Sequence, residues 1–559
     1  MALLCALAAA GAPQSPGPAE FSLVVLHTSD LHGRVHPVDA LADRDYGEGL
    51  ARVAAAVRAI RAEGLPTLLV DSGDTIQGAP EQAVAFGRAG ADDPIVAAMN
   101  LVGYDAMALG NHEFDFGRQR LEASRAQARF PFLSANVLSA TTGEPAFLPY
   151  VVKSVGPLRV GILGLTTPLV VSWEPASRIE GLRFTSAVDA TRRYVPVLRD
   201  KEHCDLVVVL VHEGFERDPE TGADRGGGDE NQAYALATEV PGIDLLLTGH
   251  THTVIDPRKL GGAWVSQPGR FGNTLTRFDV KLSRAPGGWS VSEVRGANLP
   301  MKSVAADPSV LSLAAPSHEA ALALLAQTVT RLPHGLSAGD ARVADTPLLD
   351  WLHEVQRRQG KADLSFASLL PGTMPPWSAG ALTIREIWSF YPFENTLVTV
   401  RATGRQVRQA LETAARCISG IETSGGGLSW RRNPAVWGYN CDTMDGAEYA
   451  LDPTRPEGQR VLFLRRGGKP VGEDDVFLVA LNSYRAAGGG GYSVWRACAR
   501  VAETETSLRE LLIEDARGRA ALDPATNENW FLSPSLPEGP LRTPAAPRPQ
   551  TTHSGLPPR

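Results

Sequence analysis

The sequence lacks several features that mark common classes of protein. Only five of its 559 residues are cysteine, and no two of them form a CxxC pair, so neither a zinc ribbon nor a thioredoxin-type redox site is expected. Positive charge is not in excess, because the formal net charge is −8, and this argues against a general nucleic-acid-binding surface. No internal stretch approaches about 18 consecutive apolar residues, the length typical of a membrane-spanning helix. A single nucleotide bound in a pocket is compatible with all three absences.

The composition is that of a globular protein, with 43% hydrophobic and 21% charged residues. A chain of 559 residues is too long for one hydrophobic core, which favours two domains. Residues 1–10 are apolar, and small residues and prolines follow them. This pattern is typical of a secretory signal, although the positive start of such a signal is missing; a frayed apolar terminus is the alternative. We interpret residues 1–20 as a signal and expect a periplasmic or secreted protein.

The cysteines bear on the same question of compartment. If Cys5 is removed with the signal, four cysteines remain, and those in the second half of the chain are Cys417, Cys441 and Cys498. An oxidising compartment would allow one disulfide among these three. The sequence does not choose the pair.

Short runs of β-branched residues and leucine recur along the first half, and each ends abruptly in polar residues. The runs span residues 22–27, 66–70, 106–109, 158–165, 206–211 and 243–247. Runs of this kind predict strands buried on both faces. Stretches with helical character, such as 49–63 and 187–202, lie between them. The alternation predicts an α/β sheet covered by helices, with the functional residues at the carboxyl ends of the strands.

The pattern changes near residue 299. Residues 304–332 predict a mainly helical connector, and a region of mixed strand and helix signals runs from there to about residue 534. Proline, threonine, arginine and serine dominate the remaining residues, which carry no apolar periodicity. We expect this tail to be disordered.

The polar residues at the strand ends suit a metal site. They are Asp30, His32, Asp74, Asn111, His212, His250 and His252. Carboxylates, imidazoles and an amide are ligands for divalent ions of the Mn, Zn, Fe, Co or Mg class. Any one of these residues is more often a cap or a surface group, but their joint occurrence at successive strand ends has no comparable structural explanation. The sequence therefore predicts a site for two divalent ions, which would bind a phosphoryl group and lower the pKa of an attacking water.

These motifs resemble a known family. Residues 30–33 (DLHG), 73–74 (GD), 110–113 (GNHE), His212 and 249–252 (GHTH) resemble the signature of calcineurin-like metallophosphoesterases, in the order of that family. The resemblance implies a β-sandwich flanked by helices. It also implies one ion held by Asp30, His32, Asp74 and His252, and a second ion held by Asp74, Asn111, His212 and His250.

The same resemblance assigns two residues beside the ions. It implies that His112 points at the phosphate and stabilises the transition state or the leaving group. Asp115 would orient the imidazole of His112, as a carboxylate paired with a histidine commonly does. We interpret Glu113, between them, as structural.

The second half resembles the C-terminal domain of the secreted 5′-nucleotidase superfamily, so that the similarity covers roughly residues 21–534. The domain boundaries that follow are a signal (1–20), a calcineurin-like phosphoesterase domain (21–298), a helical linker (299–332), a C-terminal α/β substrate domain (333–534) and a disordered tail (535–559). In that superfamily the C-terminal domain supplies the substrate pocket, and two aromatic rings hold the base between them. Stacking of this kind accepts any nucleobase.

Within the superfamily, several segments resemble the 2′,3′-cyclic-nucleotide 2′-phosphodiesterase/3′-nucleotidase branch: 45–46, 164–168 with Trp173 beyond it, 438–446 and 482–492. The resemblance implies Tyr439 and Tyr484 as the stacking pair. It offers Asn440, Asp442 and Arg485 as weaker candidates for substrate contacts. Cys441 stands where the branch usually has an aromatic residue, so packing around the base is expected to differ here.

The lack of a motif found in 5′-nucleotidases also favours this branch. True 5′-nucleotidases usually carry an Asn-Gly-Gly-Ile-Arg segment whose arginine grips the 5′-phosphate, whereas residues 362–380 contain neither an arginine nor a Gly-Gly pair. We therefore expect a monomeric enzyme that hydrolyses 2′,3′-cyclic nucleotides to 3′-nucleotides and then to nucleosides, with a nucleotide and no nucleic-acid polymer as its partner. The alternatives are a 5′-nucleotidase or UDP-sugar hydrolase, a thiosulfohydrolase acting on a carrier protein, and a secreted binding protein with a vestigial site.

Overall fold

The computed structural model describes residues 19–87, 91–225, 230–285, 288–371, 374–424 and 427–534. The expected signal at 1–20 lies almost entirely outside these ranges, and the expected disordered tail at 535–559 lies wholly outside them. Among the described helices, none has both the length and the apolar character that crossing a bilayer requires.

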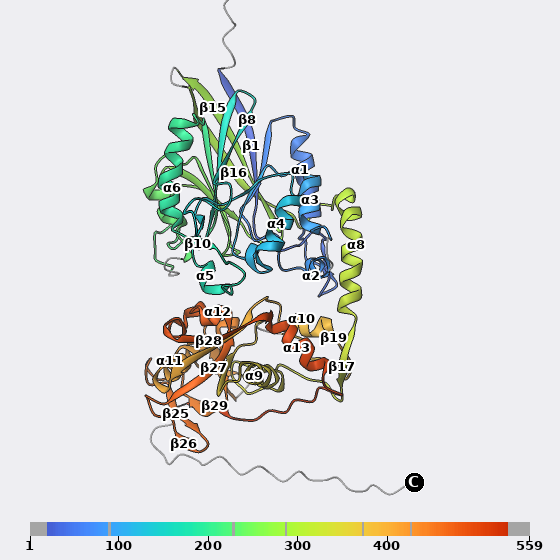
Figure 1. Ribbon diagram of the computed structural model, residues 1–559, viewed down its shortest axis with the longest axis vertical. Helices are drawn as coiled ribbons and strands as arrows, with labels where there is room; N and C mark the ends of the chain where they lie inside the picture. The colour runs from blue at the N-terminus through green and yellow to red at the C-terminus, as the bar shows by residue number, and fades with distance from the viewer. Residues whose placement is uncertain are drawn as a thin grey trace, which may run out of the picture.

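The first half of the chain is built on two six-stranded sheets that pack face to face (Figure 1). The first sheet has the order β16 (Gly288–Pro300), β15 (Thr274–Ala285), β1 (Glu20–Thr28), β4 (Thr67–Asp71), β5 (Ala106–Ala108) and β6 (Phe132–Leu133). The second has the order β13 (Val254–Leu260), β14 (Ala263–Pro268), β12 (Leu245–Thr248), β11 (Leu206–His212), β9 (Leu158–Thr166) and β8 (Tyr150–Val155). Leu23 and Val25 of the first sheet share one buried core with Ile162 and Leu210 of the second. The expected β-sandwich is thus confirmed.

Every apolar run that predicted a strand forms one, namely β1, β4, β5, β9, β11 and β12. In the first sheet β1, β4 and β5 run parallel, and in the second β9, β11 and β12 do. Their carboxyl ends therefore meet at one end of the sandwich, and the polar residues that follow them gather there.

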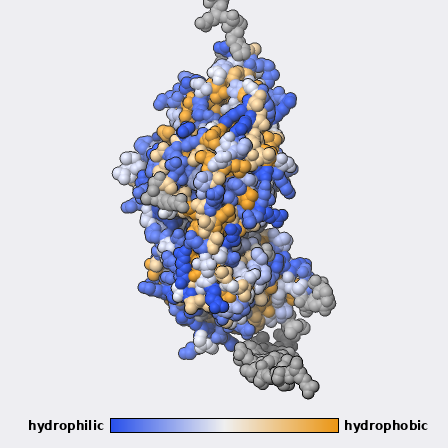
Figure 2. Space-filling view, turned by 90° about the vertical axis from the view of Figure 1, so that its right-hand side faces the viewer, coloured by the Kyte–Doolittle hydropathy of each residue, from blue (hydrophilic) through white to orange (hydrophobic). Residues whose placement is uncertain are grey.

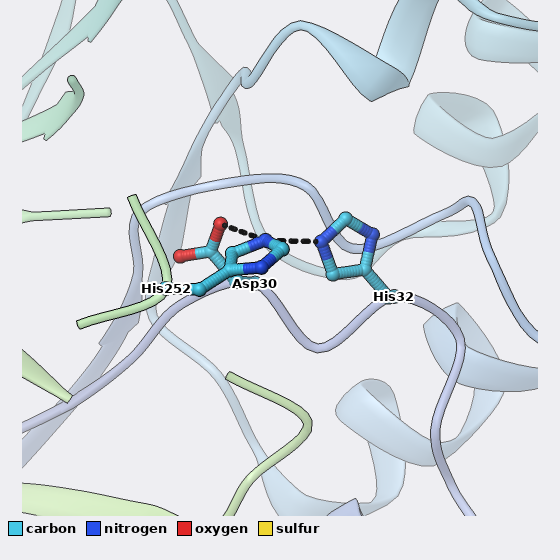
Figure 3. Close-up of side chains that lie close together, drawn as sticks. All are labelled: Asp30, His32 and His252. Carbon is cyan, nitrogen blue, oxygen red and sulfur yellow. Dashed lines mark hydrogen bonds and ion pairs between the residues drawn. The ribbon is translucent and has the colours of Figure 1, made fainter. Parts of the chain in front are cut away.

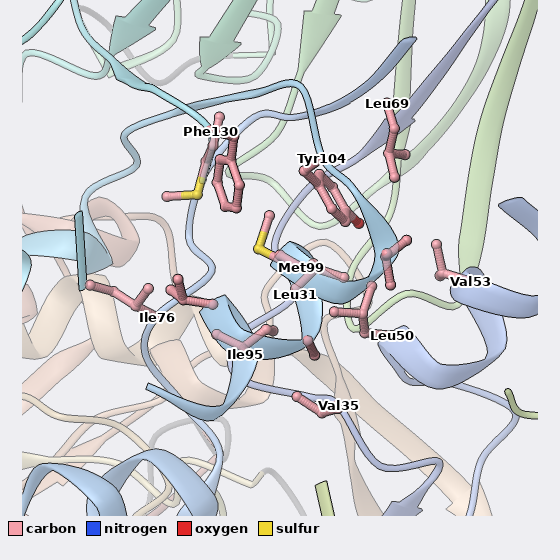
Figure 4. Packing of buried hydrophobic residues seen from close by; sticks show 14 of the residues in the cluster. Leu31, Val35, Leu50, Val53, Leu69, Ile76, Ile95, Met99, Tyr104 and Phe130 are labelled. Atoms are coloured by element: carbon pink, nitrogen blue, oxygen red, sulfur yellow. The ribbon is translucent and has the colours of Figure 1, made fainter. Parts of the chain in front are cut away.

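Helices cover the outer face of each sheet. α1 (Leu50–Arg61) and α3 (Pro94–Val102) pack on the first sheet, around a core that Figure 4 shows from close by. α6 (Ala187–Pro196), which η2 (Val197–Lys201) continues, and α7 (Ala233–Glu239) pack on the second. Shorter elements complete this half: β2 (Val38–Asp39), β3 (Arg44–Asp45), α2 (Pro80–Phe86), η1 (His112–Phe114), α4 (Gly117–Gln127), β7 (Val137–Ser139), α5 (Val170–Trp173) and β10 (Leu182–Phe184).

The connector between the halves is helical only in part. The helix α8 (Pro308–Leu325) is capped at its N-terminus by Asp307, whose carboxylate accepts hydrogen bonds from the backbone N–H groups of Ser309 and Val310. This helix packs along α2 and α3. The prediction of helix up to residue 332 is wrong at its end, because Thr328–Leu332 form strand β17, paired with β19 (Gly380–Thr383). The β-branched run Thr-Val-Thr favours this extended form.

The second half contains a five-stranded sheet in the order β23 (Thr443–Asp445), β18 (Leu364–Ala367), β27 (Val476–Asn482), β20 (Thr396–Thr403) and β28 (Ala499–Ser507). A four-stranded sheet in the order β26 (Lys469–Pro470), β25 (Val461–Arg466), β24 (Glu448–Leu451) and β29 (Trp530–Leu532) and a hairpin of β21 (Ile418–Ser424) and β22 (Gly427–Arg432) accompany it. The helical elements are α9 (Pro347–Gly360), α10 (Ile384–Phe390), α11 (Gly404–Ala414), η4 (Ala415–Cys417), η5 (Gly438–Asn440), α12 (Ser483–Ala486), η6 (Gly489–Gly491), η7 (Ser493–Ala497) and α13 (Leu508–Arg517). The mixed strand and helix signals are borne out.

The two halves meet at the end of the sandwich where its parallel strands finish. Arg385 of the second half donates a hydrogen bond of 2.7 Å to the carbonyl of Leu41, and Ala40 is buried in the core of the second half. Figure 1 shows α5 on the sandwich directly above α12, and these two helices pack together. On the side that α8 borders, hydrophobic and hydrophilic residues lie side by side over both halves (Figure 2).

Candidate metal centre and substrate site

The predicted metal ligands all lie at the junction of the halves, just after strands or at their last residue. Asp30 and His32 follow β1, Asp74 follows β4, Asn111 follows β5, His212 ends β11, and His250 and His252 follow β12. Five of the ten described non-glycine residues with positive φ belong to this set, with φ values of 54° (Asp30), 47° (His32), 56° (Asp74), 71° (His250) and 57° (His252). Non-glycine residues rarely hold this conformation, and those that do concentrate at functional sites.

The first cluster consists of Asp30, His32 and His252, whose ligand atoms all lie within 4.8 Å of one another (Figure 3). The Nε2 atoms of His32 and His252 are 3.0 Å apart, and His252 Nε2 is 3.4 Å from Asp30 Oδ1. His32 Nδ1 lies 3.0 Å from Gln77 Oε1, so that ring nitrogen donates and Nε2 keeps its lone pair. The three side chains thus turn their free ligand atoms toward one point.

The second cluster consists of Asp74, His212 and His250, whose ligand atoms also lie within 4.8 Å of one another. His212 Nε2 is 3.0 Å from Asp74 Oδ2 and 4.0 Å from Asp30 Oδ1, so the two clusters adjoin. The Oδ1 atom of Asn111 is buried with no hydrogen-bond partner among the described residues. An amide oxygen left in that state fits a metal ligand.

The charges of these residues suit divalent ions. Burial opposes ionisation of Asp30, but hydrogen bonding to His252 and the charge of His212 outweigh it and lower its pKa. The same balance, with His212 and His112 as the neighbours, holds the pKa of Asp74 well below its usual range. Burial lowers the pKa of His32 to about 3, so its imidazole is neutral. Burial alone would lower the pKa of His212, but the charge of Asp74 raises it to about 9, so an ion bound at the second cluster would displace a proton from that ring.

His112 and Asp115 form a pair beside the second cluster. His112 Nδ1 lies 2.9 Å from Asp115 Oδ2, and His112 Nε2 lies 4.0 Å from Asp74 Oδ2. The His112 side chain is 31% exposed, whereas that of Asp115 is buried. Burial alone would lower the pKa of His112, but the charges of Asp115 and Asp74 raise it to about 10. The imidazole is therefore oriented and is accessible on its Nε2 side.

Glu113 holds two loops together, in agreement with the structural role that the sequence analysis gave it. Its buried carboxylate accepts the backbone N–H groups of Asp74 at 2.8 Å, Thr75 at 2.6 Å and Gly110 at 2.6 Å. These bonds join the loop after β4 to the loop after β5.

Three residues near the ligands were not found from the sequence. Glu230 Oε1 lies 2.9 Å from His250 Nε2, Arg270 Nη1 lies 3.3 Å from His252 Nδ1, and the Trp173 ring stacks on that of His250 at 5.6 Å. Arg270 follows β14, so the strand-end rule would have indicated it had β14 been recognised. Trp173 was noted only as a mark of the branch, and the segment around Glu230 gives no signal of its own.

Tyr439 and Tyr484 lie in the second half, on η5 and α12, where these elements approach the metal ligands. Burial raises the pKa of both phenols, that of Tyr484 to about 12, and the charge of Arg485 opposes the rise. The helix α12 packs against α5, whose Trp173 ring stacks on His250, so Tyr484 lies on an element next to the second cluster. A Cβ on Gly489 would come within 2.5 Å of the Tyr484 ring, so glycine is needed where the backbone packs on that ring.

Asp442 and Arg485 form a buried ion pair, with 2.8 Å between Asp442 Oδ1 and Arg485 Nη2. Arg485 also donates to the carbonyls of Tyr439 at 3.0 Å and Gly489 at 2.5 Å, and its Nη1 lies 3.4 Å from Asn440 Oδ1. These contacts hold the backbone on both sides of the tyrosine pair, and the guanidinium is already occupied by protein groups.

The structure also chooses the disulfide. Cys417 bonds Cys441, and Cys204 and Cys498 are free and buried. Cys441 directly follows η5, so the bond ties the turn that carries Tyr439 to the end of η4.

Comparison with known proteins agrees with this arrangement. Residues 23–254 match the family profile of calcineurin-like phosphoesterases, and residues 325–497 match that of the 5′-nucleotidase C-terminal domain. The 2′,3′-cyclic-nucleotide 2′-phosphodiesterase/3′-nucleotidase of Salmonella typhimurium is 30% identical over 592 aligned positions, covering 93% of this chain and 90% of that protein. The trifunctional nucleotide phosphoesterase YfkN of Bacillus subtilis is 27% identical over 94% of this chain, which spans only 40% of its length. A Staphylococcus aureus structure assigned as a 5′-nucleotidase, solved with alpha-ketoglutarate, superposes with a TM-score of 0.79 at 26% identity, covering 91% of this chain and 99% of that one.

Proposed function

Because the chain belongs to the family of 2′,3′-cyclic-nucleotide 2′-phosphodiesterases/3′-nucleotidases, and is thus a metal-dependent hydrolase of nucleotide phosphoesters, we propose that its substrates are 2′,3′-cyclic nucleotides and 3′-nucleotides. The first reaction would open the cyclic phosphate by breaking the bond to the 2′ oxygen and leave a 3′-nucleotide. The second would remove the 3′-phosphate and leave the nucleoside.

One observation carries the proposal. The helix that carries Tyr484, α12, packs against α5, whose Trp173 ring stacks on the metal-cluster residue His250 at 5.6 Å, and Arg485 of α12 donates to the Tyr439 carbonyl at 3.0 Å. A nucleotide whose base lies between the rings would therefore have its sugar phosphate within reach of the clusters. Stacking on the tyrosines would contribute roughly 1–3 kcal/mol per base without selecting a particular base.

We propose the following roles for the site residues. Asp30, His32, Asp74 and His252 would hold one divalent ion, and Asp74, Asn111, His212 and His250 would hold the other. When bound, such ions neutralise phosphate charge and make hydroxide available near neutral pH. His112, oriented by Asp115, would donate a hydrogen bond from Nε2 to the phosphoryl group or a proton to the departing oxygen. These ligands suit Mn, Zn, Fe, Co and Mg, so metal analysis of the purified protein is needed to identify the ions.

The position of the phosphate separates this proposal from its nearest alternative. The arginine with which 5′-nucleotidases usually grip the terminal phosphate is missing from residues 362–380, and Arg485 is paired with Asp442. One observation supports the alternative, a 5′-nucleotidase or UDP-sugar hydrolase: the superposition on the Staphylococcus aureus structure has a TM-score of 0.79.

Phosphate release from four substrates with added Mn²⁺ tests the proposal. The substrates are 2′,3′-cyclic AMP, 3′-AMP, 5′-AMP and a UDP-sugar, with alkaline phosphatase coupled to any product that keeps a phosphate. We expect kcat/KM to be highest for the first two substrates. Preference for 5′-AMP or the UDP-sugar would overturn the proposed specificity, and loss of all turnover in Asp74→Asn would assign the activity to this site.

We also propose that the protein works in the periplasm or outside the cell. The Cys417–Cys441 disulfide supports this location, because disulfides persist in oxidising compartments and are rare in the cytoplasm. Cell fractionation with detection of the intact disulfide by mass spectrometry tests it, and a reduced protein confined to the cytoplasm would contradict it. We propose further that the enzyme is a monomer, which light scattering after gel filtration would test.

A further inference from the structure

The loop that follows β14 holds an arginine, Arg270, beside the first metal cluster. Phe271 in this loop has a φ of 57°, and its backbone N–H donates to the carbonyl of Asp30 at 2.8 Å. The side-chain oxygen of Asn273 accepts the backbone N–H of Arg270 at 3.2 Å. These bonds fix the backbone of Arg270 next to the metal-cluster residue Asp30.

The side chain of Arg270 is exposed, and its guanidinium has few protein partners. Its Nη1 lies 3.3 Å from His252 Nδ1, and its guanidinium carbon lies 4.8 Å from the centroid of the Phe271 ring. Within the part of the chain that the structure describes, no carboxylate forms an ion pair with it. Arg34, which lies over the same ring at 5.3 Å, differs because Asp39 pairs with it at 2.8 Å. Arg270 therefore brings an uncompensated positive charge to the first cluster.

The contact between Arg270 and His252 is incompatible with a loaded first cluster. A guanidinium only donates hydrogen bonds, so this contact needs a lone pair on His252 Nδ1. The other ring nitrogen, Nε2, faces His32 Nε2 at 3.0 Å and Asp30 Oδ1 at 3.4 Å, and it is therefore the ligand atom (Figure 3). A neutral imidazole that offers its Nε2 lone pair to an ion carries its proton on Nδ1. Two donors would then face each other, so metal loading releases the guanidinium from His252.

The released guanidinium is placed to bind an anion at the cluster. Only the width of one imidazole ring separates it from the ligand atom of His252, so a phosphate held at the first cluster would lie within its reach. A guanidinium donates two parallel hydrogen bonds to a phosphate, and charge-assisted bonds of this kind are roughly twice as strong as neutral ones.

The charge of the phosphate determines how much such a contact contributes. A phosphomonoester such as a 3′-nucleotide carries a charge of about −1.5 to −2 near pH 7. A cyclic phosphate is a diester and carries a single negative charge. The monoester therefore gains more from a guanidinium than the cyclic ester does.

We propose that Arg270 is a phosphate-binding residue of the metal-loaded protein, and that it favours a terminal 3′-phosphate over a cyclic phosphate. It would thus act mainly in the second of the two reactions and would also hold the phosphate product. The preference between the two esters rests on the proposed function, whereas the binding of phosphate does not.

Inorganic phosphate tests the binding without any turnover. Calorimetric titration of the full-length, Mn²⁺-loaded protein should show a Kd for phosphate that rises about 10- to 100-fold in R270A. R270K should lie between R270A and the wild type, because lysine keeps the charge but not the paired donors. An equal Kd in R270A and the wild type, or no measurable phosphate binding by the loaded wild type, would overturn the proposal.

Arg284→Ala is the matched control for these variants. Arg284 is also exposed and also lies over an aromatic ring, Trp289, at 5.9 Å. It stands near the last residue of β15, whereas the loop with Arg270 precedes the first residue of that strand. R284A should therefore bind phosphate as the wild type does.

Metal affinity separates phosphate binding from support of the metal ligand His252. R270A should hold two ions per chain, and its affinity for Mn²⁺ should equal or exceed that of the wild type, because no bond to His252 has to be broken. Weaker metal binding in R270A would show that Arg270 serves His252 instead, and it would overturn the proposal.

Kinetics test the preference between the two esters. In R270A, kcat/KM for 3′-AMP should fall at least about fivefold more than kcat/KM for 2′,3′-cyclic AMP, since the difference in phosphate charge is read by the guanidinium. Equal losses for the two esters would overturn the preference. If the wild type hydrolyses neither ester while R270A still weakens phosphate binding, the proposed function fails and the phosphate-binding role of Arg270 stands.

Discussion

The Nε2 atoms of His32 and His252 face each other at 3.0 Å, so at most one of these two ring nitrogens can carry a proton. Asp30 Oδ1 lies 3.4 Å from the same atom of His252. Two imidazole lone pairs and a buried carboxylate converging in this way are stabilised by a cation. The loops that present them hold positive φ angles, a conformation that costs roughly 1–3 kcal/mol per residue.

Metal removal should therefore destabilise the protein as well as stop catalysis. Chelation followed by dialysis should lower the unfolding temperature, because free ion at 100 times its Kd contributes about 2.7 kcal/mol to the stability of the folded state. Mass spectrometry of the metals should find two ions per chain in the wild type and fewer in His252→Ala. His334→Ala, a change at a largely exposed histidine ion-paired to Asp523, should keep both ions and serves as the control. Full activity after complete chelation would contradict the metal site.

Loss of the imidazole of His112 should act on kcat. H112A removes the group that would contact the phosphoryl oxygens, and kcat should fall by about 100- to 10,000-fold with metal content unchanged. D115N should cost about 10- to 100-fold, because the ring remains but its Nδ1 partner is altered. Asp189→Asn, at an exposed carboxylate on α6, is the control and should leave kcat unchanged. Near-normal turnover by H112A would remove His112 from the reaction.

The tyrosine pair should govern KM for nucleotides. Alanine at Tyr439 or Tyr484 should raise KM roughly 5- to 150-fold, the factor that corresponds to a loss of about 1–3 kcal/mol of stacking per base. Phenylalanine at either position should preserve most of the affinity, since the ring rather than the hydroxyl makes the contact. Phe531→Ala, at an exposed aromatic residue of β29, is the matched control. Hydrolysis of glycerol 2-phosphate, which has no ring to stack, should be equal in all these variants.

Reduction of the disulfide should raise KM for nucleotides, as the tyrosine variants do, but by a smaller factor. The Cys417–Cys441 bond fixes the turn that carries Tyr439, so its loss should raise KM for nucleotides while kcat and the hydrolysis of glycerol 2-phosphate stay close to normal. The variant C417S/C441S should behave like the reduced wild type and should not respond to reductant. Cys498→Ser, at a free cysteine, is the control and should retain the response to reductant. An equal KM before and after reduction would show that the disulfide does not position Tyr439.

His353 should make the stability of the second half depend on pH. Its ring is buried between Ser365 and Thr443, and burial lowers its pKa to about 4, against a value of about 6.5 in the unfolded chain. Between these values the unfolded state binds more protons, so stability is complete above about pH 6.5 and is lost as the pH falls toward 4. The full difference amounts to about 3 kcal/mol, of which about 2 kcal/mol falls between pH 7 and pH 5. Urea unfolding of the wild type and His353→Asn at pH 7 and pH 5 measures it, and equal pH dependence in both would contradict the assignment.

The sequence predicted the strands of the first half, and the candidate ligands at their ends, where apolar runs are long and uninterrupted. The strands that lead to Asp30, Asp74 and His212 are buried on both sides, so composition alone identified them. The strand β14 was not predicted because tryptophan, serine, glutamine and proline interrupt its apolar pattern, and Arg270, which follows it, was therefore missed. β17 was assigned as helix because its short run adjoins α8.

Other parts of the site depend on contacts that sequence spacing does not encode. Glu230 lies in a segment without strand or helix periodicity, and it becomes informative only through its partner, His250. The choice between Cys441 and Cys498 as the partner of Cys417 likewise follows from the packing of η4 against η5 rather than from spacing.

The central claim is that one metal site carries a 2′,3′-cyclic nucleotide through a 3′-nucleotide to a nucleoside. A ³¹P NMR time course with purified enzyme, Mn²⁺ and 2′,3′-cyclic AMP as the only phosphoester tests it most directly. The account predicts that the cyclic phosphate signal falls, that 3′-AMP rises and then declines, and that inorganic phosphate accumulates, with none of these changes in Asp74→Asn. Accumulation of 2′-AMP, or a cyclic phosphate that persists while 5′-AMP in a parallel sample is consumed, would contradict it.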